Sequence, residues 1–127
     1  MELPALVTLI ALLEYITFTF HAGTSRVKYD VPAPATTGNP EWERLFRVQQ
    51  NTLEQLMVFL PSLWIFSTFV SPTIGAAIGL VFIIARPIYA VAYVKDPGKR
   101  AFGFVAGFLA TTVLTLGGIG GIIYGLL

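Results

Sequence analysis

The sequence predicts an all-α integral membrane protein: a bundle of four transmembrane helices in a single domain of residues 1–127. Hydrophobic residues make up 55% of the chain and charged residues only 12%, and the mean hydropathy is +0.75. A soluble domain spends about a quarter of its residues on charge, so this supply could not cover a surface that faces water. Lipid must therefore surround most of the chain.

Four apolar segments are each long enough to cross roughly 30 Å of bilayer hydrocarbon as a helix. We expect helices at residues 3–22, 40–70, 73–94 and 99–126. Strands are excluded because lipid offers backbone groups no hydrogen-bond partner, and four strands cannot close a barrel. The first segment follows Glu2 and lacks the basic start of a secretory signal, so we expect a retained helix.

Turn signals separate the four segments. Residues 23–39 are rich in proline and threonine, which predicts an irregular connection, and residues 71–72 and 96–98 predict tight turns. The basic residues flank the first and third connections: Arg26, Lys28, Arg44, Arg47, Arg86, Lys95, Lys99 and Arg100. The positive-inside rule then predicts that these two connections are cytoplasmic and that both chain ends lie on the opposite side.

Glycine pairs at four-residue spacing occur in the last two segments, and they predict close approach between helices in lipid. They are Gly75 and Gly79, Gly103 and Gly107, and Gly117 and Gly121.

Charge and cysteine content exclude several classes of function. The net charge of +1 gives no electrostatic reason to expect a nucleic-acid partner. The absence of cysteine excludes disulfides, thiolate metal sites and a cysteine nucleophile. The one histidine, His21, stands alone, so no metal site is expected.

A polar stripe runs along the first half of the second segment. At about 100° per residue, four polar side chains fall within an arc of roughly 80° on one helical face. They are Arg44, Arg47, Asn51 and Glu54. The other faces are apolar, which predicts that the stripe lines a cavity. Arg47 and Glu54 lie about two turns apart, which we expect to be too far for a direct ion pair, so that a ligand would bridge them.

A second polar group lies at the same end of the predicted bundle. Arg86, Tyr89 and Tyr93 recur at three- and four-residue spacing and share a helical face, and Arg100 follows the third connection. Ionic groups at membrane depth are costly, so they normally pair or bind a ligand.

These residue types indicate a small zwitterionic ligand with more than one carboxylate. Arginine guanidinium groups match carboxylates, Glu54 suits an ammonium group, and Asn51 and the tyrosine hydroxyls suit amides. Glutathione fits, since it has two carboxylates, one ammonium group, two amides and a thiol. The chemical fit alone does not single it out.

Three motifs, in order and at fitting spacing, resemble the MAPEG family, the membrane-associated proteins in eicosanoid and glutathione metabolism. Residues 36–44 resemble the entry to the family's second helix, and residues 47–54 resemble its Arg-x-x-x-Asn-x-x-Glu motif. Residues 85–93 resemble the third-helix motif, with Arg100 at the fitting distance. The likeness covers most of the chain.

The resemblance implies a homotrimer in the lipid bilayer, with glutathione bound as co-substrate between neighbouring subunits near the cytoplasmic face. It implies that one subunit supplies Arg47, Asn51, Glu54, Tyr89, Tyr93 and Arg100 and that the next supplies Arg26 and Gln49. Arg100 is the expected catalytic residue, because a nearby guanidinium favours the nucleophilic thiolate; Arg26 stays open as an alternative. A lipophilic second substrate would arrive through the membrane.

The implied activity is that of a glutathione S-transferase of the microsomal type, with glutathione peroxidase activity as an option. Val27 and Ala101 stand where specialised eicosanoid-producing members have an arginine and a serine, and Gln55 stands where a tyrosine often follows the family's motif glutamate; these differences count against the specialised activities. An eicosanoid-type isomerase or synthase and a non-catalytic lipid-binding scaffold remain the alternatives, and the physiological second substrate stays open. The short connections favour a bacterial inner membrane over the endoplasmic reticulum.

Three other ionic residues have competing interpretations. Arg44 either lines the cavity with the rest of the polar stripe or simply caps its helix or pairs with Glu41. Arg86 either joins the ligand site or ties the third helix to Glu54 or to a carbonyl. Glu14 is expected to be a buried polar partner of the second helix rather than a ligand contact.

Overall fold

The computed structural model describes all residues 1–127 as four long helices and one short 3-10 turn, without strands. The elements are α1 (Glu2–Tyr29), α2 (Pro40–Phe69), α3 (Pro72–Lys95), η1 (Pro97–Lys99) and α4 (Ala101–Leu126). Each of the four long helices is long and apolar enough to cross a membrane. The predicted all-helical membrane fold is confirmed.

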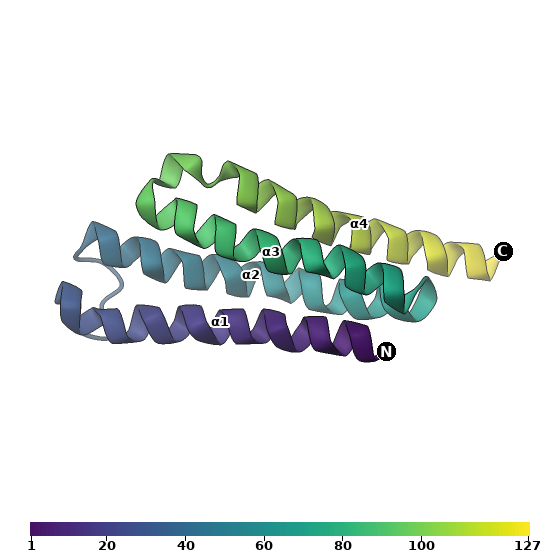
Figure 1. Ribbon diagram of the computed structural model, residues 1–127, viewed down its shortest axis with the longest axis horizontal. Helices are drawn as coiled ribbons and strands as arrows, with labels where there is room; N and C mark the ends of the chain where they lie inside the picture. Colours follow the sequence, from purple (N-terminus) through teal and green to yellow (C-terminus); the bar gives the residue numbers. More distant parts are fainter.

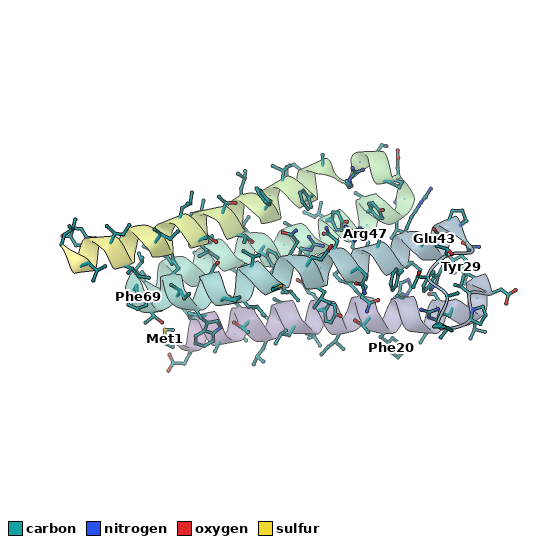
Figure 2. The ribbon with its side chains drawn as sticks, turned by 180° about the vertical axis from the view of Figure 1, so that it is seen from behind. Met1, Phe20, Tyr29, Glu43, Arg47 and Phe69 are labelled. Atoms are coloured by element: carbon teal, nitrogen blue, oxygen red, sulfur yellow. The ribbon has the colours of Figure 1, made fainter.

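The four helices alternate in direction and form a bundle in which α2 and α3 each pack against the other three helices, with α1 and α4 on opposite sides (Figure 1). Both chain ends lie at one end of the bundle with the α2–α3 turn, whereas the 30–39 loop and η1 lie at the other. We call the latter the loop end. Tyr29, Glu43 and Arg47 lie toward it, away from Met1 and Phe69 (Figure 2). The basic residues that flank the two connections are thereby gathered at the loop end.

The interior of the bundle is built from one apolar face of α2. Leu56, Phe59 and Leu63 recur at three- and four-residue spacing, and each is at most 4% exposed. The Phe59 ring stacks on Phe82 of α3 with 3.9 Å between ring centroids. Large apolar side chains also cover the outside of the bundle, as Phe20 does on α1, where they suit a lipid environment (Figure 2).

The first helix is longer than predicted, since α1 continues to Tyr29 instead of ending near residue 22. It ends at Asp30, which adopts a left-handed conformation with φ 54°. Aspartate tolerates this conformation better than most residues because its short polar side chain interacts locally. The backbone N–H of Asp30 reaches the carbonyl of Val27, and that of Val31 reaches the carbonyl of Arg26, so the helix end is satisfied.

Helix α2 begins with strong capping at the loop end. Asn39 Oδ1 accepts hydrogen bonds from the backbone N–H groups of Glu41 and Trp42, and Pro40 occupies the first helical position. This capping fixes the position at which the polar stripe of α2 starts.

Helices α3 and α4 approach each other closely at Gly103. A Cβ atom there would lie 2.5 Å from the backbone nitrogen of Tyr89 and 2.8 Å from its Cα atom. The close approach predicted from glycine spacing is therefore confirmed at this position. It places the start of α4, next to Arg100, directly against the tyrosine face of α3.

Candidate functional site

A cavity of about 630 Å³ opens at the loop end between α2, α3, η1 and α4. This volume lies within the roughly 300–1,000 Å³ that small-molecule sites occupy. Five of the predicted site residues line it: Arg47, Asn51, Tyr89, Tyr93 and Arg100. The cavity thus brings together residues from two sequence motifs and from the turn before α4.

Arg47 lies at the edge of this cavity and forms an ion pair with Glu54. Its Nη1 atom is 3.2 Å from Glu54 Oε1, and the two side chains are 50% and 56% exposed. The expectation that two helical turns would separate them too far is wrong. Seven residues rise about 10.5 Å, but the two side chains share a face and extend toward each other along it. Glu54 does not line the cavity and joins the site through Arg47.

Asn51 is anchored from behind by Arg86. Arg86 Nη2 donates hydrogen bonds to Asn51 Oδ1 and to Thr52 Oγ1, each at 2.8 Å. Thr52 in turn donates to the carbonyl of Val48 at 2.7 Å. Arg86 is 1% exposed and does not line the cavity. It ties α3 to α2 through the side-chain carbonyl oxygen of Asn51 and the hydroxyl of Thr52, as its structural interpretation expected of a carbonyl partner, and it does not pair with Glu54.

The two tyrosines form the α3 wall of the cavity. Their rings stack with 5.6 Å between centroids, and the Arg86 guanidinium lies 4.4 Å from the centroid of Tyr89. Tyr89 is only 2% exposed because Gly103 brings α4 against it. The stacked ring pair is thus packed against Arg86 and the start of α4, and both tyrosines line the cavity.

Arg100 stands at the mouth of the cavity, immediately before α4. Its Nη1 atom donates to the carbonyl of Pro97 at 2.8 Å, and Asp96 Oδ1 accepts from the backbone N–H of Gly98 at 3.0 Å. These bonds order the turn that presents Arg100. The side chain is exposed and has no acidic partner, so its guanidinium is available to an anion.

Arg26 and Gln49 do not line the cavity of their own chain. Arg26 Nη1 donates to the carbonyls of Val31 and Ala35 at 3.1 and 2.7 Å, and its guanidinium lies 4.4 Å from the ring centroid of Trp42. These contacts hold it beside the 30–39 loop with most of its donors unused. Gln49 is half-buried on α2.

Two other predictions from the sequence have structural outcomes. Arg44 donates to the carbonyl of Val94 at 3.1 Å, so it ties α2 to the end of α3 and does not pair with Glu41. Glu14 is half-buried on α1, but its Oε1 atom is enclosed without a hydrogen-bond partner, so the expected polar contact with α2 is not formed.

Sequence reasoning missed the apolar part of the cavity wall, which includes Phe104 and Val105 of α4. Phe104 follows Arg100 by four residues, and this spacing on a helix places two side chains on one face. That periodicity was the available signal. The α4 side of the cavity is apolar, whereas the α2 side carries Arg47 and Asn51. The cavity therefore suits a ligand that has both polar and apolar parts.

A second cavity of about 310 Å³ lies between α1, α2 and α3. It is apolar except for His21 and Lys95, and it contains none of the predicted site residues.

Comparisons with known proteins agree with this architecture. The MAPEG family pattern matches residues 4–120. Over 116 residues the chain is 45% identical to an uncharacterized protein of Synechocystis, covering 91% of this chain and 85% of that protein. It is 36% identical to microsomal glutathione S-transferase 2 of Homo sapiens over 120 residues, covering 94% and 82%. It is also 36% identical to leukotriene C4 synthase of Bos taurus over 98 residues, covering 77% and 65%.

The matched region contains all four long helices in large part and every polar residue of the cavity. The chain, a four-helix membrane bundle with a polar cavity at its loop end, thus belongs to the MAPEG family.

Proposed function

We propose that the chain is a membrane-bound glutathione transferase that binds glutathione in the cavity at the loop end and presents its thiolate to lipophilic electrophiles or hydroperoxides. The observation that carries the proposal is the convergence of Arg47, Asn51, Tyr89, Tyr93 and Arg100 on one cavity. The similarity to microsomal glutathione S-transferase 2 supports it.

The residues present fit the chemistry of glutathione. Arg47 and Arg100 supply two separate guanidinium groups, and guanidinium groups bind carboxylates and thiolates well. Glu54, held beside Arg47, supplies the one carboxylate that suits an ammonium group. The asymmetric charge of this site matches a ligand with more negative groups than positive ones.

Arg100 is the proposed catalytic residue. Its guanidinium is exposed at the cavity mouth without an acidic partner. A cation beside a thiol stabilises the thiolate, which is the reactive nucleophile. Phe104 and Val105 form an apolar wall next to this position, where a lipophilic second substrate would lie.

We further propose that the protein is a homotrimer and that the neighbouring subunit completes the site. Arg26 and Gln49 lie outside the cavity of their own chain. The loop and Trp42 hold Arg26 with unused donors, as expected of a residue that reaches into an adjacent copy. The distribution of basic residues supports a cytoplasmic position for the loop end, and a bacterial inner membrane is the proposed location.

Two alternative functions would use the same fold: a specialised eicosanoid synthase, which acts on a different second substrate, and a scaffold, which catalyses no reaction. A specialised eicosanoid synthase is disfavoured by Val27, Gln55 and Ala101, as the sequence comparison indicated. A non-catalytic lipid-binding scaffold would not need a solvent-accessible, unpaired Arg100. Purified protein in nanodiscs should conjugate glutathione to chlorodinitrobenzene; binding of glutathione without turnover of either this electrophile or a lipid hydroperoxide would instead support the scaffold.

A further inference from the structure

Arg86 is buried at membrane depth, and the proposed function gives it no role. It touches the cavity only indirectly, through its hydrogen bonds to Asn51 and Thr52 and its contact with the Tyr89 ring. Burying an arginine in a membrane helix costs free energy, so we expect its role to lie in the side chains that it orients by hydrogen bonding.

The chemistry of guanidinium determines which way Asn51 faces. An arginine side chain has donors and no acceptor. The Asn51 atom 2.8 Å from Arg86 Nη2 must therefore be the carbonyl oxygen and not the amide nitrogen. The amide nitrogen of Asn51 is thus directed away from Arg86, and Asn51 lines the cavity.

Thr52, the residue after Asn51, forms a second hydrogen bond with Arg86 and so helps to hold the guanidinium in place. Its hydroxyl donates to the carbonyl of Val48 and so accepts from Arg86. One Nη2 group, which carries two N–H bonds, satisfies both Asn51 and Thr52. Thr52 and Arg86 are each 1% exposed, so the bond between them is enclosed within the bundle.

No ion pair neutralises Arg86 inside the bundle. Its Nε atom is an enclosed donor without a hydrogen-bond partner, and Oε1 of Glu14 on α1 is an enclosed acceptor without one. The bonds to Asn51 and Thr52 are therefore the only hydrogen bonds that Arg86 makes.

We infer that Arg86 is a positioning residue that sets the polarity of the cavity at Asn51. It holds the amide so that Asn51 offers a hydrogen-bond donor, and the cavity at that point selects an acceptor oxygen, a carboxylate or an amide carbonyl, over an ammonium group. This inference rests on the proposed function, because it assigns the polarity of part of the same glutathione site.

The test pairs isosteric variants and measures glutathione affinity by calorimetry in nanodiscs, together with the melting temperature without glutathione. Asn51→Asp keeps an oxygen toward Arg86 but removes the donor toward the cavity, so affinity should fall about tenfold or more. Its melting temperature should equal or exceed that of the wild type, whereas Asn51→Leu should lose both binding and stability.

Arg86 itself is tested by rescue. Arg86→Met frees the Asn51 amide to rotate and should weaken binding about tenfold, whereas Arg86→Lys keeps a donor and should recover most of the affinity. Ser62→Ala is the matched control, because it removes a 2.8 Å bond between α2 and α4 away from the cavity and should leave affinity unchanged.

Asn51→Asp binding glutathione as tightly as the wild type would overturn the assigned polarity, and Arg86→Met doing so would overturn the positioning role. If Arg86→Met fails to fold, Asn51→Asp and Arg86→Lys still decide the matter. A folded wild type that does not bind glutathione would contradict the proposed function instead. The melting temperatures of Asn51→Asp and Asn51→Leu would then still test the bond to Arg86, and equal destabilisation of both would overturn it.

Discussion

Arg47 and Glu54, seven residues apart on α2, form an ion pair 3.2 Å long at the edge of the cavity. Both side chains are about half exposed, and exposed ion pairs of this kind contribute only about 0–1 kcal/mol to stability. The pair therefore costs little to open. A zwitterionic ligand could separate it, with a carboxylate on Arg47 and an ammonium group on Glu54.

Replacing Glu54 with glutamine should weaken glutathione binding without destabilising the fold. The ammonium group of glutathione would lose its carboxylate partner, and a charge-assisted hydrogen bond is worth about tenfold in affinity. Calorimetry should show this loss while the melting temperature stays close to that of the wild type. An analogue of glutathione that lacks the ammonium group is the control, and Glu54→Gln should bind it as well as the wild type does. Equal weakening for both ligands would contradict the assignment.

Replacing Arg100 with alanine should abolish conjugation of chlorodinitrobenzene while glutathione binding persists, because the thiolate loses its stabilising cation. Stopped-flow ultraviolet absorbance of the thiolate should show that it no longer forms. Lys99→Ala is the matched control, since Lys99 is the adjacent basic residue and does not line the cavity. Unchanged turnover in Arg100→Ala would remove Arg100 from the mechanism.

Gly103→Ala should separate the two walls that carry Tyr89 and Arg100. The added methyl group would meet the Tyr89 backbone at 2.5 Å, and such overpacking costs about 1–3 kcal/mol. We expect a lower melting temperature and reduced turnover. Gly120→Ala is the control, because a methyl group there meets nothing within 4 Å. Equal melting temperatures for the two variants would show that α3 and α4 are less tightly packed than described.

Mixed oligomers test whether the site is shared between subunits. Arg26→Ala and Arg100→Ala should each be inactive alone, but their co-assembly should restore part of the activity, because some sites then combine an intact cavity with an intact neighbouring Arg26. Arg47 and Arg100 line one cavity, so Arg47→Ala with Arg100→Ala should restore none. Recovery in the second mixture, or none in the first, would contradict the shared site.

The sequence predicted the helical segments well because each one must satisfy its backbone inside lipid, which leaves a helix as the only solution. It misplaced the end of α1, since nothing in the sequence around Gly23 reveals that Asp30 would adopt the left-handed conformation that ends the helix. The start of α2 was predicted correctly from local signals, because Asn39 caps the helix and Pro40 occupies its first position.

The cavity was predictable where residues share a helical face and less so where side chains choose among partners. The four-residue spacing of Tyr89 and Tyr93 placed them together, as the structure shows. The Arg47–Glu54 pair depends on the reach of two long side chains, and the Arg86–Asn51 bond joins residues 35 positions apart. Neither follows from periodicity along one helix.

The most direct test of the central claim is calorimetric titration of glutathione into the intact protein in nanodiscs, with Arg47→Ala as comparison. The account predicts saturable binding to the wild type and a loss of at least about tenfold in Arg47→Ala, because a guanidinium–carboxylate contact is removed. No uptake of glutathione by folded wild-type protein, or equal affinity for both proteins, would contradict it.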